Sequence, residues 1–257
     1  MTVSFDLLVE VAPNGACLGH IPSLPGLSFR AEDTSQLLGV ASGKVVDYAR
    51  WLVEQNLSDL NARASDVVRL VCSGRESEIQ IIERERKEGA RPWVSGNPAA
   101  LFRSDRSALT DGEVLSRMLF LRRVVNRMRS LVVKFSPTER TWKPAPEGRS
   151  LNETLTHIGN CVWWYCSRID DSLPEPDERS NEDPLDRIER LLETASQFLI
   201  SLPFAARGEV HVPKRFHTRD PREAWTHTKV CRRQAEHAWE HLLGMTRAVD
   251  EMTHGSN

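Results

Sequence analysis

The chain has 257 residues, of which 40% are apolar and 27% are charged, and its formal net charge at pH 7 is −2. This composition is typical of a globular protein long enough for two domains. The nearly balanced charge argues against a partner attracted by bulk electrostatics, such as nucleic acid. No apolar run is long enough to cross a bilayer, so a membrane-spanning protein is not expected.

Cysteine usage indicates a reducing environment. The five cysteines are odd in number and none of them forms a C-x-x-C pair, which fits free thiols better than a disulfide framework. The first residues contain neither a basic segment nor an apolar segment of the kind found in signal peptides. We therefore expect a cytoplasmic protein.

The first third of the chain predicts a small α+β unit. Strands are expected at residues 4–11, 16–20, 27–30, 67–72 and 78–82. Asn14-Gly15 predicts a hairpin turn between the first two strands, because both residues tolerate positive φ. Asp33 and Thr34 can cap a helix whose apolar positions continue to Leu52. Together these elements predict an antiparallel sheet covered by one helix.

The rest of the chain predicts a second, helical domain. Residues 84–108 are rich in charge, Gly and Pro and are interpreted as a linker between domains at 1–83 and 109–257. Thr110-x-x-Glu113 and Ser150-x-x-Glu153 are capping boxes, and Asp183 precedes a proline at a first helical position. Three helices are expected at about 110–134, 150–169 and 183–202. A fourth is expected to begin between residues 220 and 226 and to end at about residue 251. They predict a four-helix bundle.

Three histidines are the candidate metal ligands. His237 and His241 lie one turn apart on one helix face, and His157 lies on another predicted helix. Three neutral imidazoles on one divalent ion would leave coordination positions open, as in catalytic sites. Such an ion, Zn²⁺ or Ni²⁺, would lower the pKa of a water or substrate thiol. The alternative is that these are core or surface histidines without a metal.

Acidic residues near these histidines are the candidate catalytic groups. Position 238 is Ala, so the H-E-x-x-H motif of zinc peptidases and its general base are absent. Glu240 flanks both histidines of the pair and is a candidate for proton transfer, although an exposed glutamate is the simpler interpretation. Glu153 lies one turn before His157 and is a second candidate, although its role in the capping box is the simpler one.

The N-terminal region resembles the HicB antitoxins. The similarity rests on the strand from Phe5, on Asn14-Gly15, on Ile21-Pro22-Ser23-Leu24-Pro25-Gly26-Leu27 and on the helix that starts at Asp33. The resemblance implies an antitoxin fold over residues 3–83. In that family this domain binds a small toxin ribonuclease, and a separate segment binds DNA.

The C-terminal region resembles the DinB/YfiT superfamily of four-helix metalloproteins over residues 109–252. The similarity rests on Leu155–Ile158, Val162–Tyr165, Trp225-Thr226, Lys229–Arg233 and the histidine pair. The resemblance implies that His157, His237 and His241 bind a divalent metal. Some relatives use low-molecular-weight thiols such as mycothiol or bacillithiol as cosubstrates.

Two functions from different classes follow. The first is a metal-dependent enzyme that acts on a small molecule, as a thiol-dependent transferase or a hydrolase, and forms a homodimer. The alternative is a non-catalytic regulatory protein, in which a HicB-type module binds a partner and the helical bundle serves for dimerisation.

Overall fold

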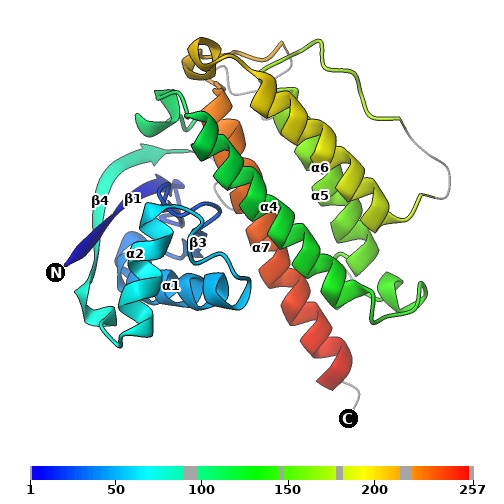
Figure 1. The fold of residues 1–257 in the computed structure, drawn as a ribbon, viewed down its shortest axis with the longest axis horizontal. Helices are drawn as coiled ribbons and strands as arrows, with labels where there is room; N and C mark the ends of the chain where they lie inside the picture. The colour runs from blue at the N-terminus through cyan, green and yellow to red at the C-terminus, as the bar shows by residue number, and fades with distance from the viewer. Residues whose placement is uncertain (1, 90–97, 145–147, 178–181, 215–221, 255–257) are drawn as a thin grey trace.

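The structure, a computed structural model, describes residues 2–89, 98–144, 148–177, 182–214 and 222–254. A sheet with its covering helices occupies one side of the molecule, and four further helices occupy the other (Figure 1). The protein is therefore of the mixed α+β class that the sequence predicts, with the sheet first and the helices after it.

The sheet has four strands in the order β3-β2-β1-β4. They are β1 (Val3–Val11), β2 (Cys17–His20), β3 (Ser28–Ala31) and β4 (Ile79–Glu88). Strands β1, β2 and β3 are antiparallel, joined first by a turn in which Gly15 has a φ of 88°, as Asn14-Gly15 predicts. Strand β4 runs parallel to β1, from the pair Val3 and Ile79 onward. The prediction of a wholly antiparallel sheet is wrong, because the chain crosses over from β3 to the other edge before it forms β4.

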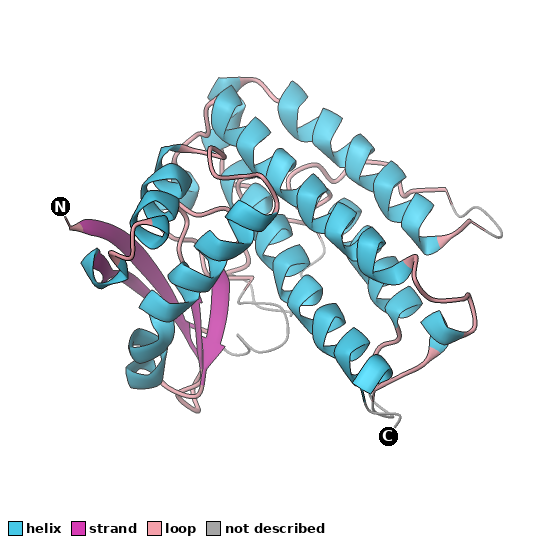
Figure 2. Ribbon diagram, turned by 60° about the horizontal axis from the view of Figure 1, so that its bottom comes forward, coloured by secondary structure: helices cyan, strands magenta, loops and turns pink. Residues whose placement is uncertain are grey.

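Two helices make that crossover. Helix α1 (Thr34–Glu54) begins as predicted at Asp33, whose side chain accepts a hydrogen bond from the Gln36 backbone N–H at 2.8 Å. Its buried face contributes Leu37, Val45 and Leu52 to the core. The helix itself packs against the sheet (Figure 2).

Helix α2 (Ala62–Cys72) replaces the strand predicted at 67–72. Its run of valine and leucine has strand-like composition, but Ala64, Val67 and Val68 are buried at helical spacing against α1. Asn61 caps this helix by accepting a hydrogen bond from the Ala64 backbone N–H at 2.8 Å. The error arose because a short apolar run has no periodicity that separates the two structures, and packing decides between them.

Strand β4 is longer than predicted and continues to Glu88, into the segment interpreted as a linker. Beyond the part that the structure does not describe, Ala100, Leu101 and Phe102 are buried. A short 3₁₀ helix, η2 (Ser104–Arg106), follows them. The division into two domains stays a prediction, since the buried residues of both regions form one continuous core.

Four helices form the C-terminal region. They are α4 (Asp111–Val132), α5 (Leu151–Cys166), α6 (Pro184–Ser201) and α7 (His227–His254), with short 3₁₀ helices η1 (Glu76–Glu78), η3 (Glu139–Thr141) and η4 (Phe204–Gly208). Both predicted capping boxes are present, and Asp183 caps α6. Helix α7 packs against α4 and α5, and α6 packs against the same two helices (Figure 1). Within the described ranges, no helix has the length and apolar character that crossing a bilayer requires.

An aromatic cluster joins the sheet region to the helical region. Tyr48 and Trp51 of α1 pack against Phe120 of α4 and Trp239 of α7, with the two tryptophan rings 4.8 Å apart. The Tyr48 hydroxyl also donates a hydrogen bond to the Pro25 carbonyl at 2.7 Å. Tyr48, Phe120 and Trp239 are buried and Trp51 is partly buried against them, so the two regions share apolar surface.

A buried ion-pair network joins the same two regions. Arg232 of α7 donates two hydrogen bonds to Asp105 of η2, both 2.8 Å long. Its remaining guanidinium nitrogen lies 3.1 Å from Glu236, which also accepts from Arg233 at 2.8 Å. All four side chains are almost completely buried. A buried charge is strongly unfavourable without a partner, so these pairs hold α7 against the segment that precedes α4.

His20 of β2 extends this network into the sheet. Its Nε2 lies 3.1 Å from Glu10 of β1, and its Nδ1 lies 3.0 Å from Glu236 of α7. Burial lowers the pKa of His20, but the charge of Glu236 and the hydrogen bonds to both carboxylates outweigh it, so the pKa is raised. The network therefore favours a protonated imidazole that donates to both carboxylates.

Replacing Gly26 by alanine is expected to lower the free energy of unfolding by about 2–4 kcal/mol. Gly26 has a φ of 82°, and a Cβ at this position would overlap the Phe120 ring. Chemical denaturation of the variant measures the loss. The matched control is Gly39→Ala on the exposed face of α1, where a Cβ meets no atom within 4 Å. The free energy of unfolding of this control should rise by up to about 1 kcal/mol. A Gly26→Ala protein as stable as the wild type would contradict the close approach of Gly26 to Phe120.

Replacing Arg232 by methionine is expected to cost about 3–5 kcal/mol of unfolding free energy, because the buried carboxylate of Asp105 loses its cation and Glu236 loses one of its three cationic partners. Urea denaturation of Arg232→Met and of Arg127→Met tests this. Arg127 lies on an exposed face of α4, and its replacement should change the free energy of unfolding by no more than about 0.5 kcal/mol. Equal stabilities of the two variants would show that the network does not hold the regions together.

Candidate metal centre

Helix α7 provides two of the three candidate ligands. Thr226 caps this helix, since its hydroxyl accepts from the Lys229 backbone N–H at 3.1 Å and donates to the Asp105 carbonyl at 2.5 Å. His237 and His241 follow on one face, one turn apart. His237 is buried and His241 is half-buried, so the first lies at the bottom of the site and the second toward its opening.

Helix α5 provides the third candidate ligand, His157. It packs against α7, and Gln234 of α7 donates hydrogen bonds to the Val162 carbonyl and to the Cys166 sulfur, both at 3.2 Å. These contacts fix how α5 and α7 align along their lengths. Gln234 lies about one turn before His237 in α7. His157 thus faces His237 and His241 although about eighty residues separate it from them in the chain.

The three imidazoles converge through their Nε2 atoms. Nε2 of His237 lies 3.2 Å from Nε2 of His157 and 3.2 Å from Nε2 of His241. One ligand atom from each of the three lies within 4.8 Å of the others. Two nitrogen donors at 2.0–2.1 Å from one tetrahedral zinc ion would be about 3.3 Å apart, so the distance from His237 to each of the other two histidines fits a shared cation.

Hydrogen bonds among the histidines do not account for this arrangement. The single Nε2 of a neutral imidazole carries either one proton or one lone pair. Nε2 of His237 faces two other nitrogens at equal distance, so it can make a good hydrogen bond with only one of them. A divalent cation satisfies all three lone pairs at once, and the donor set therefore fits a metal.

The electrostatic environment keeps these histidines neutral. Burial, with a smaller effect of the Arg149 charge, lowers the pKa of His157 to about 4. Burial, then the charges of His157 and Arg149, lowers the pKa of His241 to about 3. Burial and the other two histidines lower the pKa of His237 well below its usual value. Neutral imidazole is the form that binds metal, so the site is ready for an ion at pH 7.

Cys161 is the nearest thiol. Its sulfur lies 3.7 Å from Nε2 and 3.8 Å from Nδ1 of His157. Burial raises its pKa to about 11, so the side chain is a neutral thiol at pH 7. The three imidazole nitrogens form the candidate donor set, and Cys161 packs beside His157.

The two acidic candidates are both engaged elsewhere. Glu153 completes the capping box of α5 and forms an ion pair with Lys143 at 2.7 Å. Glu240 accepts hydrogen bonds from Ser28 at 3.3 Å and Arg30 at 3.1 Å, both in β3. Ala238 is buried, so the position that carries glutamate in zinc peptidases packs in the core. A catalytic role for Glu153 or Glu240 stays a prediction.

The sheet region reaches the candidate centre through Glu240. The residue lies next to His241 in α7, and its partner Arg30 is close enough for its charge to contribute to the lowered pKa of His241. This ion pair links β3 to the turn of α7 that carries the second ligand. The sheet therefore helps to position that turn.

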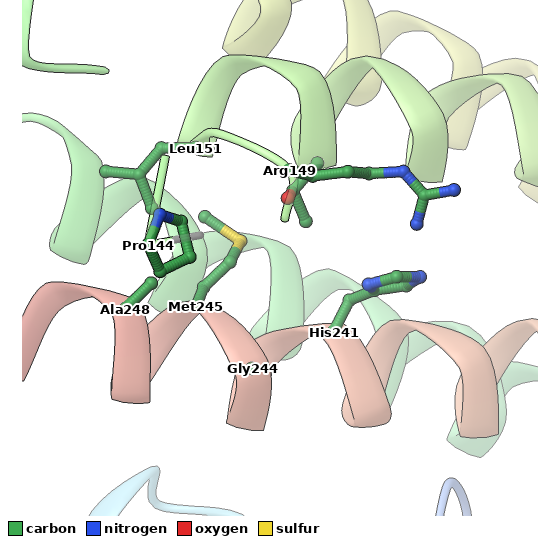
Figure 3. A pocket seen from close by; sticks show the side chains of 8 residues that line it. Pro144, Arg149, Leu151, His241, Gly244, Met245 and Ala248 are labelled. Carbon is green, nitrogen blue, oxygen red and sulfur yellow. The ribbon is translucent and has the colours of Figure 1, made fainter. Parts of the chain in front are cut away.

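A pocket of about 400 Å³ opens beside His241 between α5 and α7. Its wall contains Leu151 and Thr154 of α5, and Gly244, Met245 and Ala248 of α7. Pro144 and Arg149, from the segment before α5, complete it, and the guanidinium group of Arg149 extends across from the His241 ring (Figure 3).

Arg149 is a residue of the site that the sequence motifs do not predict. One signal was available, because Arg149 directly precedes the N-cap Ser150, and a cation at a helix N-terminus is electrostatically unfavourable. His20 was missed as well, and no spacing could have shown that it lies between two carboxylates.

Residues 121–245 match the model of the DinB superfamily. The matched segment includes all three histidines and extends from Leu121, within α4, to Met245, within α7. No curated protein and no solved structure matches the chain. The resemblance of residues 3–83 to HicB antitoxins stays a prediction.

Metal affinity is expected to change little between about pH 7 and pH 5.5, because burial lowers the pKa of His157 to about 4 and of His241 to about 3, and lowers the pKa of His237 well below its usual value. Three ordinary histidines, each with a pKa near 6.5, would lose affinity by roughly a thousandfold over this range. Isothermal titration calorimetry with Zn²⁺ at both pH values measures the change. A drop of that size would contradict the low pKa values.

Proposed function

We propose that His157, His237 and His241 bind a divalent metal ion, Zn²⁺ or Ni²⁺, and that the protein is a metal-dependent enzyme acting on a small molecule. The observation that carries this proposal is the convergence of three Nε2 atoms at a spacing that suits one cation. The match of residues 121–245 to the DinB superfamily supports it independently. On this basis the four packed helices form the bundle of that superfamily.

The chemistry of the donor set favours catalysis over a structural role. Structural zinc sites have four protein ligands, whereas three leave at least one position open. A divalent ion held there supplies Lewis acidity and lowers the pKa of a bound thiol or water. The pocket beside His241 gives a small molecule access to that position.

The protein's own residues then bind and orient the reactants. Cys161 stays a neutral thiol, which leaves the role of nucleophile to an external thiol or to water. This favours a thiol-dependent transferase, with a hydrolase as the second reaction type. We propose a low-molecular-weight thiol as the cosubstrate, and a homodimer as the assembly.

The sheet region has a supporting role in this proposal. It covers one side of α7 and holds Glu240 through Arg30 and Ser28. A regulatory module of the antitoxin type would not require three converging imidazoles beside a pocket, and the enzyme is therefore preferred.

Replacing His237 or His241 by alanine is expected to reduce bound metal from about one ion per chain to less than about a tenth, because two nitrogen donors bind far more weakly than three. Protein purified after loading with Zn²⁺ is analysed by plasma mass spectrometry.

The matched control is Cys72→Ser, since Cys72 is an exposed thiol of α2 that could hold adventitious metal. This variant should keep its ion. Circular dichroism establishes that each variant is folded. A folded His237→Ala or His241→Ala protein with the metal content of the wild type would refute the proposed site.

A further inference from the structure

The pocket beside His241 has one polar end and one apolar end. Leu151, Met245 and Ala248 form the apolar wall, and Pro144 closes it. In Figure 3 these side chains gather on one side, whereas Arg149 extends toward the opposite side, above His241. A ligand that fills the pocket therefore meets an apolar surface, a cation and a candidate metal ligand.

Arg149 is available as a charged partner. Within the described residues, no acidic side chain pairs with it, although most other arginines near the helices are paired, such as Arg129 with Glu189. The nearby cation Lys143 is neutralised by Glu153 at 2.7 Å. Arg149 and His241 line the same pocket, so a ligand there can contact both side chains.

We propose that this pocket binds a small molecule with one carboxylate, which Arg149 holds while the apolar part of the molecule lies against Leu151 and Met245. The inference rests on the proposed function, and it names the substrate class of the same site. A planar guanidinium group binds a carboxylate through two parallel hydrogen bonds.

The charge of the pocket selects this class over a polyanion. Among the residues that line the pocket, Arg149 is the sole permanent cation, and a phosphate ester would carry nearly two negative charges. More than half of the lining side chains are apolar, which suits a carboxylate with a hydrocarbon body. Arg30 and Lys44 line a different pocket, between the sheet region and α7.

Hexanoate, its neutral analogue hexanamide and inorganic phosphate are the probes. Isothermal titration calorimetry on the Zn²⁺-loaded protein is expected to show that hexanoate binds at least about tenfold more tightly than hexanamide or phosphate. Arg149→Gln should remove this preference for hexanoate, and Arg149→Lys should restore part of it. Arg127→Gln, on the exposed face of α4, is the matched control and should bind like the wild type.

A second variant tests the pocket itself. A Cβ at Gly244 has only the far end of Arg247 within 4 Å, so Gly244→Leu fits on the helix and fills the pocket. It should weaken hexanoate binding at least about tenfold without changing the charge of Arg149.

The outcomes separate this inference from the proposed function. Metal content is measured in every variant, and all should hold the wild-type amount. If the wild type binds no metal, the proposed function fails, but titration of the metal-free protein should still show that hexanoate binding depends on Arg149. If Arg149→Gln binds hexanoate within about twofold of the wild type, or if phosphate binds as tightly as hexanoate, the carboxylate site is refuted.

Discussion

The burial of the first half of α7 is the constraint on which the rest of the structure depends. Residues 227–239 are all buried, so more than three successive turns have no solvent-facing side. The segment nevertheless contains Lys229, Arg232, Arg233 and Glu236. Each buried charge must have partners, because desolvation without them costs several kcal/mol. The segments on both sides of α7 provide those partners, and the position of the helix is consequently fixed by specific polar contacts as well as by apolar packing.

The candidate metal centre is a consequence of that fixed position. On one side, Arg232 and Glu236 connect α7 to Asp105 and His20. On another, Gln234 connects it to α5. His237 and His241 follow within the same continuous helix, so contacts to the sheet region and contacts to α5 together set the distance between the histidines and His157. The helices that carry the three candidate ligands are therefore held by packing and by polar contacts on both sides of α7.

Most of the fold could be predicted from local signals, and the errors have physical causes. The capping boxes at Thr110 and Ser150 and the turn at Asn14-Gly15 act within a few residues, so their structures match the prediction. Helix α2 was predicted as a strand because valine-rich runs suit both structures, and its packing against α1 decides the outcome. The sequence of β4 alone does not show that it runs parallel to β1, because its direction depends on how the chain crosses from one edge of the sheet to the other.

The sequence by itself determined the spacing of His237 and His241 and the helices that carry all three histidines, because helical periodicity and capping are properties of short segments. Only the tertiary structure decided that His157 meets the other two, since a distance across the core depends on the packing of helices far apart in the chain. The same holds for Arg149 beside His241 and for His20 between Glu10 and Glu236. A single charged residue has no period, and its partner is known only when the chain is folded.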